Sequence, residues 1–214
     1  MVAIQKQQSS WLLMSTTKLL VIFLIFDLLA ILCAWLWSND IFFESRFFRL
    51  DRDRGFSENL QYIKTGIVLV LLTRAFKQLL QPVLKAWLIL FWVILVDDVV
   101  GVHEEIGELL ANTGYIPEMF GIGAQSIAEI VAFAAMEGVA LLYVLYTTLK
   151  APPDWQRFSI VFLLVFSPLI LSGIVLDATG FVFLESLGEI SSMSLILGFV
   201  HIRLKNYANV IASE

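Results

Sequence analysis

Long apolar runs separated by short polar stretches dominate the chain and define its predicted elements. Most of these runs approach the roughly 20 residues that a helix needs to cross the 30 Å core of a bilayer. A proline pair at Pro152 and Pro153 separates two of them. The pattern therefore predicts six membrane-spanning helices, over residues 18–38, 59–77, 83–100, 125–149, 158–178 and 183–203.

Composition supports one membrane-embedded domain. The 214 residues are 59% hydrophobic and 15% charged, whereas soluble domains are about 45–50% apolar and about 25% charged. Six spans would take roughly 120–130 residues, which leaves only short loops. We therefore predict an all-α integral membrane bundle that forms a single domain over residues 1–214. A single cysteine, Cys33, excludes an intramolecular disulfide and a cysteine-based zinc site.

The basic residues predict the orientation of these helices. Lysine and arginine are enriched on the cytoplasmic side of membrane proteins. With six spans, nine of them fall on one side: Lys6, Lys18, Arg74, Lys77, Lys85, Lys150, Arg157, Arg203 and Lys205. Both termini are therefore expected to be cytoplasmic. The first loop is an exception, and its arginines predict a segment that lies on the outer membrane surface: Arg46, Arg49, Arg52 and Arg54.

The end of the third predicted span carries the densest group of acidic side chains. Charged groups within a bilayer are energetically costly, so they are candidates for function. If the helix continues, five carboxylates occupy an arc of about 120° on its surface. They are Asp97, Asp98, Glu104, Glu105 and Glu108.

A histidine lies within this acidic segment but not on its acidic face. On an unbroken helix His103 points away from the carboxylates. It joins them only if the chain bends, and Gly101 is the position where a bend is easiest.

Other predicted helices bring acidic residues to the same side of the membrane. The topology comes from basic residues alone, yet it gathers most of these carboxylates in the outer half. They are Glu58, Glu129, Glu137, Asp177, Glu185 and Glu189, of which Glu137 is deeper. We therefore expect one outward-facing acidic site.

Clustered carboxylates must bind cations, share protons or pair with bases. Oxygen ligands suit Ca²⁺, Mg²⁺ or Mn²⁺, and one imidazole would admit Zn²⁺, Mn²⁺ or Fe²⁺. The predicted ligands of a divalent metal ion are Asp97, Asp98, His103, Glu104, Glu108, Glu129 and Glu189. Further candidates are Glu58, Glu105, Glu137, Asp177 and Glu185.

Two simpler interpretations stand beside the metal site. The first makes the outermost carboxylates part of a solvated helix extension: Glu104, Glu105 and Glu108. The second makes Glu58 and Glu185 helix-start residues, where a carboxylate complements the helix dipole.

Two segments resemble a pattern in small multi-pass inner-membrane proteins of bacteria. These are residues 50–64 and the motif Asp97-Asp98-x4-His103-Glu104. The resemblance implies a bacterial inner membrane and no particular activity. A comparison with alkaline ceramidase-like hydrolases is less favourable. Those enzymes carry a histidine pair at four-residue spacing in a late helix, where this chain has only His201.

Three functions follow as hypotheses. The first is a membrane protein with an outward-facing cation or proton site, with transport as its role. The second is a membrane-embedded metalloenzyme that acts on a lipid or an envelope precursor, which requires His103 to face the acidic pocket. The third is a non-catalytic partner subunit. The expected partners are membrane lipid and a cation or proton, and nucleic acid is not expected.

Overall fold

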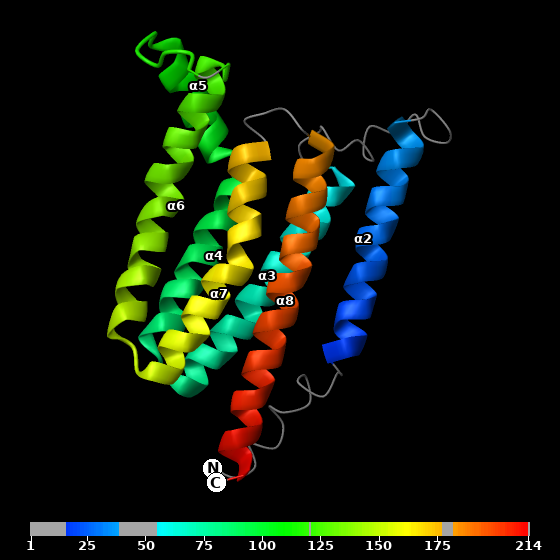
Figure 1. Cartoon of the computed structure of the whole chain (residues 1–214), viewed down its shortest axis with the longest axis vertical. Helices are drawn as coiled ribbons and strands as arrows, with labels where there is room; N and C mark the ends of the chain where they lie inside the picture. The colour runs from blue at the N-terminus through cyan, green and yellow to red at the C-terminus, as the bar shows by residue number, and fades with distance from the viewer. Residues whose placement is uncertain (1–15, 39–54, 120, 177–181, 214) are drawn as a thin grey trace.

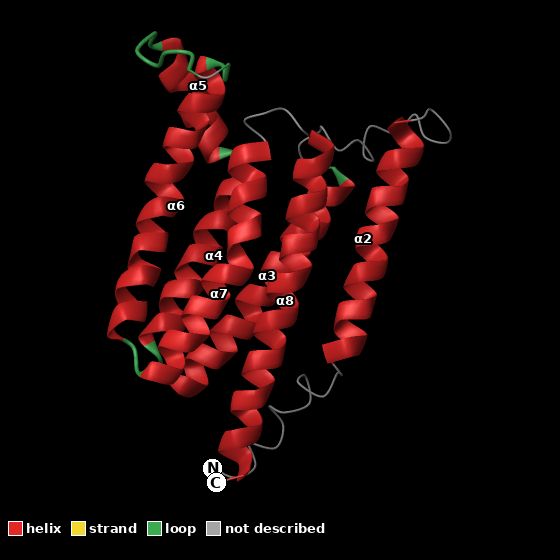
Figure 2. Cartoon of the chain, in the orientation of Figure 1, coloured by secondary structure: helices red, strands yellow, loops and turns green. Residues whose placement is uncertain are grey.

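The described part of the chain is helical throughout its regular structure (Figures 1 and 2). The structure, a computed structural model, describes residues 16–38, 55–119, 121–176 and 182–213. No strand occurs in these ranges, and the prediction of an all-α fold is confirmed. The elements are α2 (Thr16–Ser38), α3 (Phe56–Leu79), α4 (Pro82–Val100), α5 (Val102–Asn112), α6 (Ala124–Lys150), α7 (Pro153–Leu171), the π-helical segment η3 (Ser172–Leu176) and α8 (Val182–Ser213).

Three stretches of helix are long and apolar enough to cross a membrane. They are Ala124–Lys150, Pro153–Ile174 and Leu184–Tyr207, and they support a membrane protein. Helices α2, α3 and α4 cover the other three predicted ranges to within a few residues, and their crossing of the membrane stays a prediction. Helix α7 begins at Pro153 rather than at 158, because proline is compatible with a first helical turn.

Aromatic side chains form the centre of the core between α4 and α7. The rings of Trp87 and Phe162 stack with their centroids 3.9 Å apart, and Phe91 and Phe166 pack around them. The indole Nε1 of Trp87 donates a hydrogen bond of 2.9 Å to the Ser159 hydroxyl. This satisfies the one polar atom of a side chain that is fully buried.

Helix α2 lies at the edge of the bundle, beside α8 (Figure 1). It buries one strip, formed by Phe23, Asp27 and Ala30. These residues are four and three positions apart, so they share one face of the helix. Many of its other apolar side chains are exposed, as expected for a helix that faces lipid.

The two ends of the bundle differ in charge. Lys77 ends α3, Lys85 begins α4 and Lys150 ends α6, and these helix ends lie at the lower end in Figure 1. The acidic residues gather at the opposite end. That the basic end faces the cytoplasm stays a prediction. The loop arginines (Arg46, Arg49, Arg52 and Arg54) and Asp177 lie outside the described residues.

Candidate functional site

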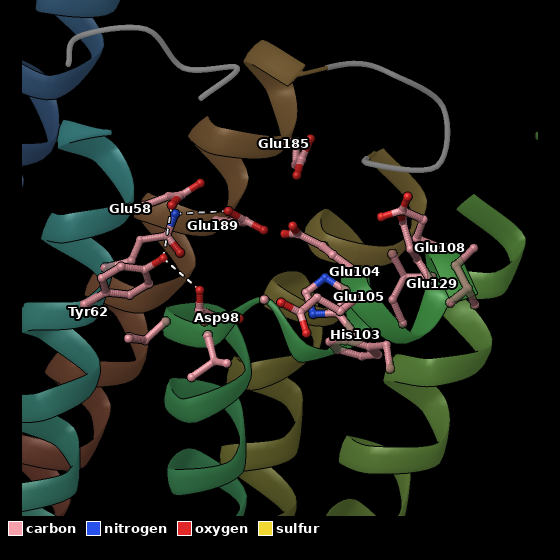
Figure 3. A pocket seen from close by; sticks show the side chains of 18 of the residues that line it. Glu58, Tyr62, Asp98, His103, Glu104, Glu105, Glu108, Glu129, Glu185 and Glu189 are labelled. Carbon is pink, nitrogen blue, oxygen red and sulfur yellow. Dashed lines mark hydrogen bonds between the residues drawn. The ribbon is translucent and has the colours of Figure 1, made fainter. Parts of the chain in front are cut away.

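A cavity of about 780 Å³ lies where α4 ends and where α3 and α8 begin (Figure 3). We call it the acidic cavity. Carboxylates from α3, α4, α5, α6 and α8 line it, and none of the described lining residues is a lysine or an arginine. The lining carboxylates are Glu58, Asp98, Glu104, Glu105, Glu108, Glu129, Glu185 and Glu189. The cavity therefore has a strongly negative potential that favours cations.

The turn between α4 and α5 brings His103 into this cavity. Gly101 adopts a left-handed conformation, with φ of +74°, and ends α4. This bend turns α5 so that His103 lies against Asp97, in the last turn of α4. Its backbone N–H donates to Asp97 Oδ1 at 2.9 Å, and its Nδ1 lies 2.8 Å from Asp97 Oδ2. The condition set by the sequence, a bend at Gly101, is met.

The pairing with Asp97 changes the protonation of His103. Partial burial of the ring disfavours the imidazolium. The hydrogen bond to Asp97 and the charges of Asp97, Glu104 and Asp98 outweigh that effect, so the pKa of His103 is raised above its ordinary value. If Nδ1 carries the proton in the neutral ring, Nε2 is the atom left to act as a ligand or base.

Two side chains of α3 form hydrogen bonds to the other helices of the cavity wall (Figure 3). The Tyr62 hydroxyl lies 3.0 Å from Glu58 Oε2 and 3.0 Å from the backbone carbonyl of Asp98. Gln61 donates a hydrogen bond of 3.0 Å to Glu189 Oε2 on α8. These contacts fix the end of α4 and the start of α8 relative to α3.

Three carboxylates meet beneath the acidic cavity, and we call them the carboxylate triad: Asp97, Asp98 and Glu137. Each offers an oxygen, and these oxygens lie within 4.8 Å of one another. Asp97 and Glu137 are buried, and Asp98 is partly buried. Glu137 Oε1 has no hydrogen-bond partner among the described residues. A buried polar atom of this kind costs about 1–3 kcal/mol unless a ligand or water satisfies it.

A second, smaller cavity adjoins the triad. It has a volume of about 60 Å³ and is lined by Asp98 and Glu137, which is enough space for a water molecule or an ion. Gln61 and Glu189 line both this cavity and the acidic cavity. The triad is therefore next to the large cavity rather than isolated in the core.

The position of the triad at a helix end adds to its negative potential. Asp97 and Asp98 lie in the last turn of α4, where the carbonyl groups of a helix carry a partial negative charge. Two carboxylates at such an end, with Glu137 close by, repel one another unless a cation or a shared proton neutralises them.

The predicted ligands do not form one compact group. Glu104, Glu105 and Glu108 are exposed at the rim of the cavity, as the solvated-helix interpretation expects, although all three also line it. Glu129 is partly buried and accepts a hydrogen bond of 2.9 Å from Gln125. Thus the buried group is smaller than the predicted metal set.

The sequence did not single out two features of the structure. Glu137 was a secondary candidate, yet it lies with Asp97 and Asp98. Its signal in the sequence was a carboxylate in the middle of an apolar span. Lys64 pairs with Asp27 on α2, a contact that the local sequence pattern does not indicate.

No protein-family model, curated protein sequence or solved structure matches the chain. The fold and the site together define a class: a helical membrane protein that carries a carboxylate-lined cavity and, beneath it, a buried group of carboxylates able to hold a metal ion.

Proposed function

We propose that the protein binds a cation at the carboxylate triad and transports it. The observation that carries this proposal is Glu137. Its buried Oε1 has no hydrogen-bond partner among the described residues, and one of its carboxylate oxygens lies within 4.8 Å of an oxygen of Asp97 and of Asp98. An oxygen-only site suits Ca²⁺, Mg²⁺ or Mn²⁺. The acidic cavity would concentrate such ions from water and deliver them to the triad.

The smaller cavity supports passage beyond the triad. It lies among α3, α4, α6, α7 and α8, and its lining includes the hydroxyl-bearing Thr65 and the thioether of Met193. Buried ionisable groups in membrane helices commonly mark ion or proton pathways. The π-helical segment η3 borders both cavities through Gly173, and π-helical segments often occur at functional sites.

The proposal is tested by metal analysis and by flux. Purified protein is dialysed against Ca²⁺, Mg²⁺ or Mn²⁺ and its retained metal is measured by mass spectrometry. The isosteric substitution Glu137→Gln is expected to lower the affinity for the retained ion on the order of tenfold or more, since a ligand loses its charge. The matched control Glu118→Gln removes an exposed carboxylate that lines neither cavity and is expected to retain the ion.

Flux through reconstituted vesicles separates a transporter from a static site. We expect the double substitution Asp97→Asn with Asp98→Asn to abolish cation uptake. If the wild-type protein retains none of the three ions and the double variant changes neither cation nor proton flux, the proposal is wrong.

A metal-dependent enzyme is the second candidate, and the His103–Asp97 pair favours it. A carboxylate that holds Nδ1 orients an imidazole for metal binding or for proton transfer. A metal held beside it would supply an activated water for attack on a lipid or an envelope precursor. The test is turnover of lipid substrates by wild type and by His103→Gln. Loss of turnover with the metal still retained would favour the enzyme.

We further propose that both termini lie in the cytoplasm, which the separation of basic and acidic ends supports. The resemblance of residues 50–64 and of the Asp97-Asp98-x4-His103-Glu104 motif to bacterial inner-membrane proteins supports that membrane as the location. Single cysteines introduced at Lys150 and at Glu108 test this orientation, in a Cys33→Ser background. A membrane-impermeant thiol reagent applied to intact cells is expected to label only the cysteine at position 108.

A further inference from the structure

A second buried charge site lies on the other side of the contact between α3 and α8. Lys64 is fully buried, and its ammonium group is paired with the carboxylate of Asp27 on α2. The same ammonium donates to the backbone carbonyl of Ile190 at 3.0 Å. The other oxygen of Asp27 accepts a hydrogen bond of 2.6 Å from the Ser194 hydroxyl. Three helices therefore contribute to one enclosed polar site.

This site is built as a cation site that already contains a cation. The Asp27 carboxylate and the Ile190 carbonyl each direct an oxygen at the Lys64 ammonium, which occupies the position that a free ion would take. The Ser194 hydroxyl holds the second oxygen of Asp27. An ion pair taken out of water is weak evidence for stability, because desolvation offsets much of the attraction. A lysine, unlike an arginine, can also lose its proton when buried.

Lys64 is connected to the acidic cavity through its neighbours on the same two helices. Gln61 lies one turn before Lys64 on α3 and donates to Glu189, the residue before Ile190 on α8. Thr65 and Met193 line the smaller cavity beside the triad, and they adjoin Lys64 and Ser194 in sequence. The α3–α8 contact thus has the triad on one side and the Lys64–Asp27 pair on the other.

We propose that Lys64 and Asp27 form a proton-exchange site that releases one proton when a cation occupies the carboxylate triad. The inference rests on the proposed cation site and specifies its coupling. An N–H bond of Lys64 breaks, the electron pair stays on Nζ, and the proton passes to water. The divalent ion brings two positive charges into the bundle and the released proton takes one away, which limits the charge that accumulates in a medium of low dielectric constant.

The charged groups around Lys64 are arranged for this exchange. On the helices that pack against α3, the charged groups in this half of the bundle are carboxylates: Asp27 on α2, Asp97 and Asp98 on α4, and Glu185 and Glu189 on α8. The Cys33 thiol on α2 is a further titratable group there. On α3 itself Glu58 lies in the first turn and Arg74 toward the other end. The remaining basic groups of these neighbours lie toward the other end: Lys18 on α2, Lys85 on α4, and His201, Arg203 and Lys205 on α8.

The test compares proton release with metal binding in the same sample. Mn²⁺ is added to purified, weakly buffered protein, and released protons are counted against retained Mn²⁺. The substitution Lys64→Arg keeps a positive charge beside Asp27, but a guanidinium does not give up its proton. We expect this variant to bind Mn²⁺ and to release about one proton fewer per bound ion than wild type. The control Lys85→Arg, at an exposed position of α4, is expected to match wild type.

A second variant covers the outcome in which arginine does not fit. The double substitution Asp27→Leu with Lys64→Met replaces the ion pair by apolar side chains, a change that folded proteins often tolerate. It is expected to fold, to retain Mn²⁺ and to release about one proton fewer per bound ion than wild type. If either variant folds, binds Mn²⁺ and releases as many protons as wild type, the pair only holds α2 in place and the inference is wrong. If wild type retains no Mn²⁺, the cation site fails and the coupling fails with it.

Discussion

The two ends of this helical bundle are built on opposite principles. Toward the start of α4, in the part of the core that we call the aromatic end, α4 and α7 meet through stacked aromatic rings, with Trp87 and Phe162 fully buried and the indole N–H satisfied. At the other end the same α4 terminates in two aspartates beside a cavity of about 780 Å³. The first arrangement maximises packing, and the second gathers like charges and leaves a buried oxygen with no partner among the described residues.

The difference indicates how the molecule divides stability and function. Close packing of large apolar side chains stabilises a fold, whereas unsatisfied or mutually repelling groups destabilise it and persist mainly at functional sites. The aromatic end therefore supports an acidic end that would not be stable by itself. Substitutions at the two ends should separate loss of stability from loss of binding.

The largest expected effect is on stability at the aromatic end. Trp87→Ala would remove a fully buried ring that contacts Phe91, Phe162 and Phe166, and should lower the free energy of unfolding by about 3–5 kcal/mol. The folded fraction should bind cation with the affinity of wild type. The measurement is unfolding in detergent, followed by metal retention.

Helix α4 provides a matched control for this substitution. Trp92 lies five residues further along, on another face of the helix, and is 52% exposed, so Trp92→Ala should change the free energy of unfolding by no more than about 0.5 kcal/mol. Equal losses for the two variants would mean that the aromatic end is not the stabilising part of the bundle.

The next effect tests how rigidly the acidic end is held. Helices α5 and α6 approach closely at Gly107, where an added methyl group would lie 2.4 Å from Glu129 Cγ and 2.9 Å from its backbone. Gly107→Ala should therefore separate the two helices at a cost of about 1–3 kcal/mol. Cation affinity should fall less than in Glu137→Gln, because Glu129 lines the cavity but lies outside the triad. Unfolding and metal retention measure both effects.

Gly138 on α6 is the corresponding control. Nothing lies within 4 Å of a methyl group added there, so Gly138→Ala should be neutral or stabilising by up to about 1 kcal/mol. If Gly107→Ala behaves like this control, α5 is loosely attached and the cavity wall is not fixed by its contact with α6.

The helices could be predicted from the sequence because each one is determined by residues that are close together in the chain. Apolar runs of membrane length and the prolines and glycines between them define α6, α7 and α8 without reference to the rest of the fold. The bend at Gly101 was also foreseeable, since glycine readily adopts positive φ. The sequence did not settle whether the chain bends at Gly101. That bend determines whether His103 faces the carboxylates.

The grouping of the carboxylates could not be predicted in the same way. Helix α4 is apolar around most of its circumference, so its sequence does not single out the face that meets α6. Asp97 and Asp98 therefore could not be matched to Glu137. Likewise Asp27 and Lys64 are 37 residues apart, and they meet only because α2 packs across α3 and α8. Each pairing depends on helix packing rather than on local pattern.

The smallest expected effect is a pH dependence at the acidic end. Because the pKa of His103 is raised in the folded protein, the native state holds this proton more tightly than the unfolded state. The stabilisation is fully present below the ordinary histidine pKa of about 6.5 and is lost as the pH rises through the higher value of the folded state. Wild type should therefore lose thermal stability with rising pH over this window.

The substitution His103→Gln isolates this effect from the other titrating groups. Glutamine can still donate to Asp97 but does not titrate, so the variant should show a flatter dependence of its unfolding temperature on pH above about 6.5. Trp87→Ala should show the same slope as wild type at a lower temperature, since its lost contacts carry no proton. Parallel curves for wild type and His103→Gln would mean that the Asp97–His103 pair does not stabilise the turn at Gly101. The acidic end would then be held by the α5–α6 contact and by the ties from Tyr62 and Gln61.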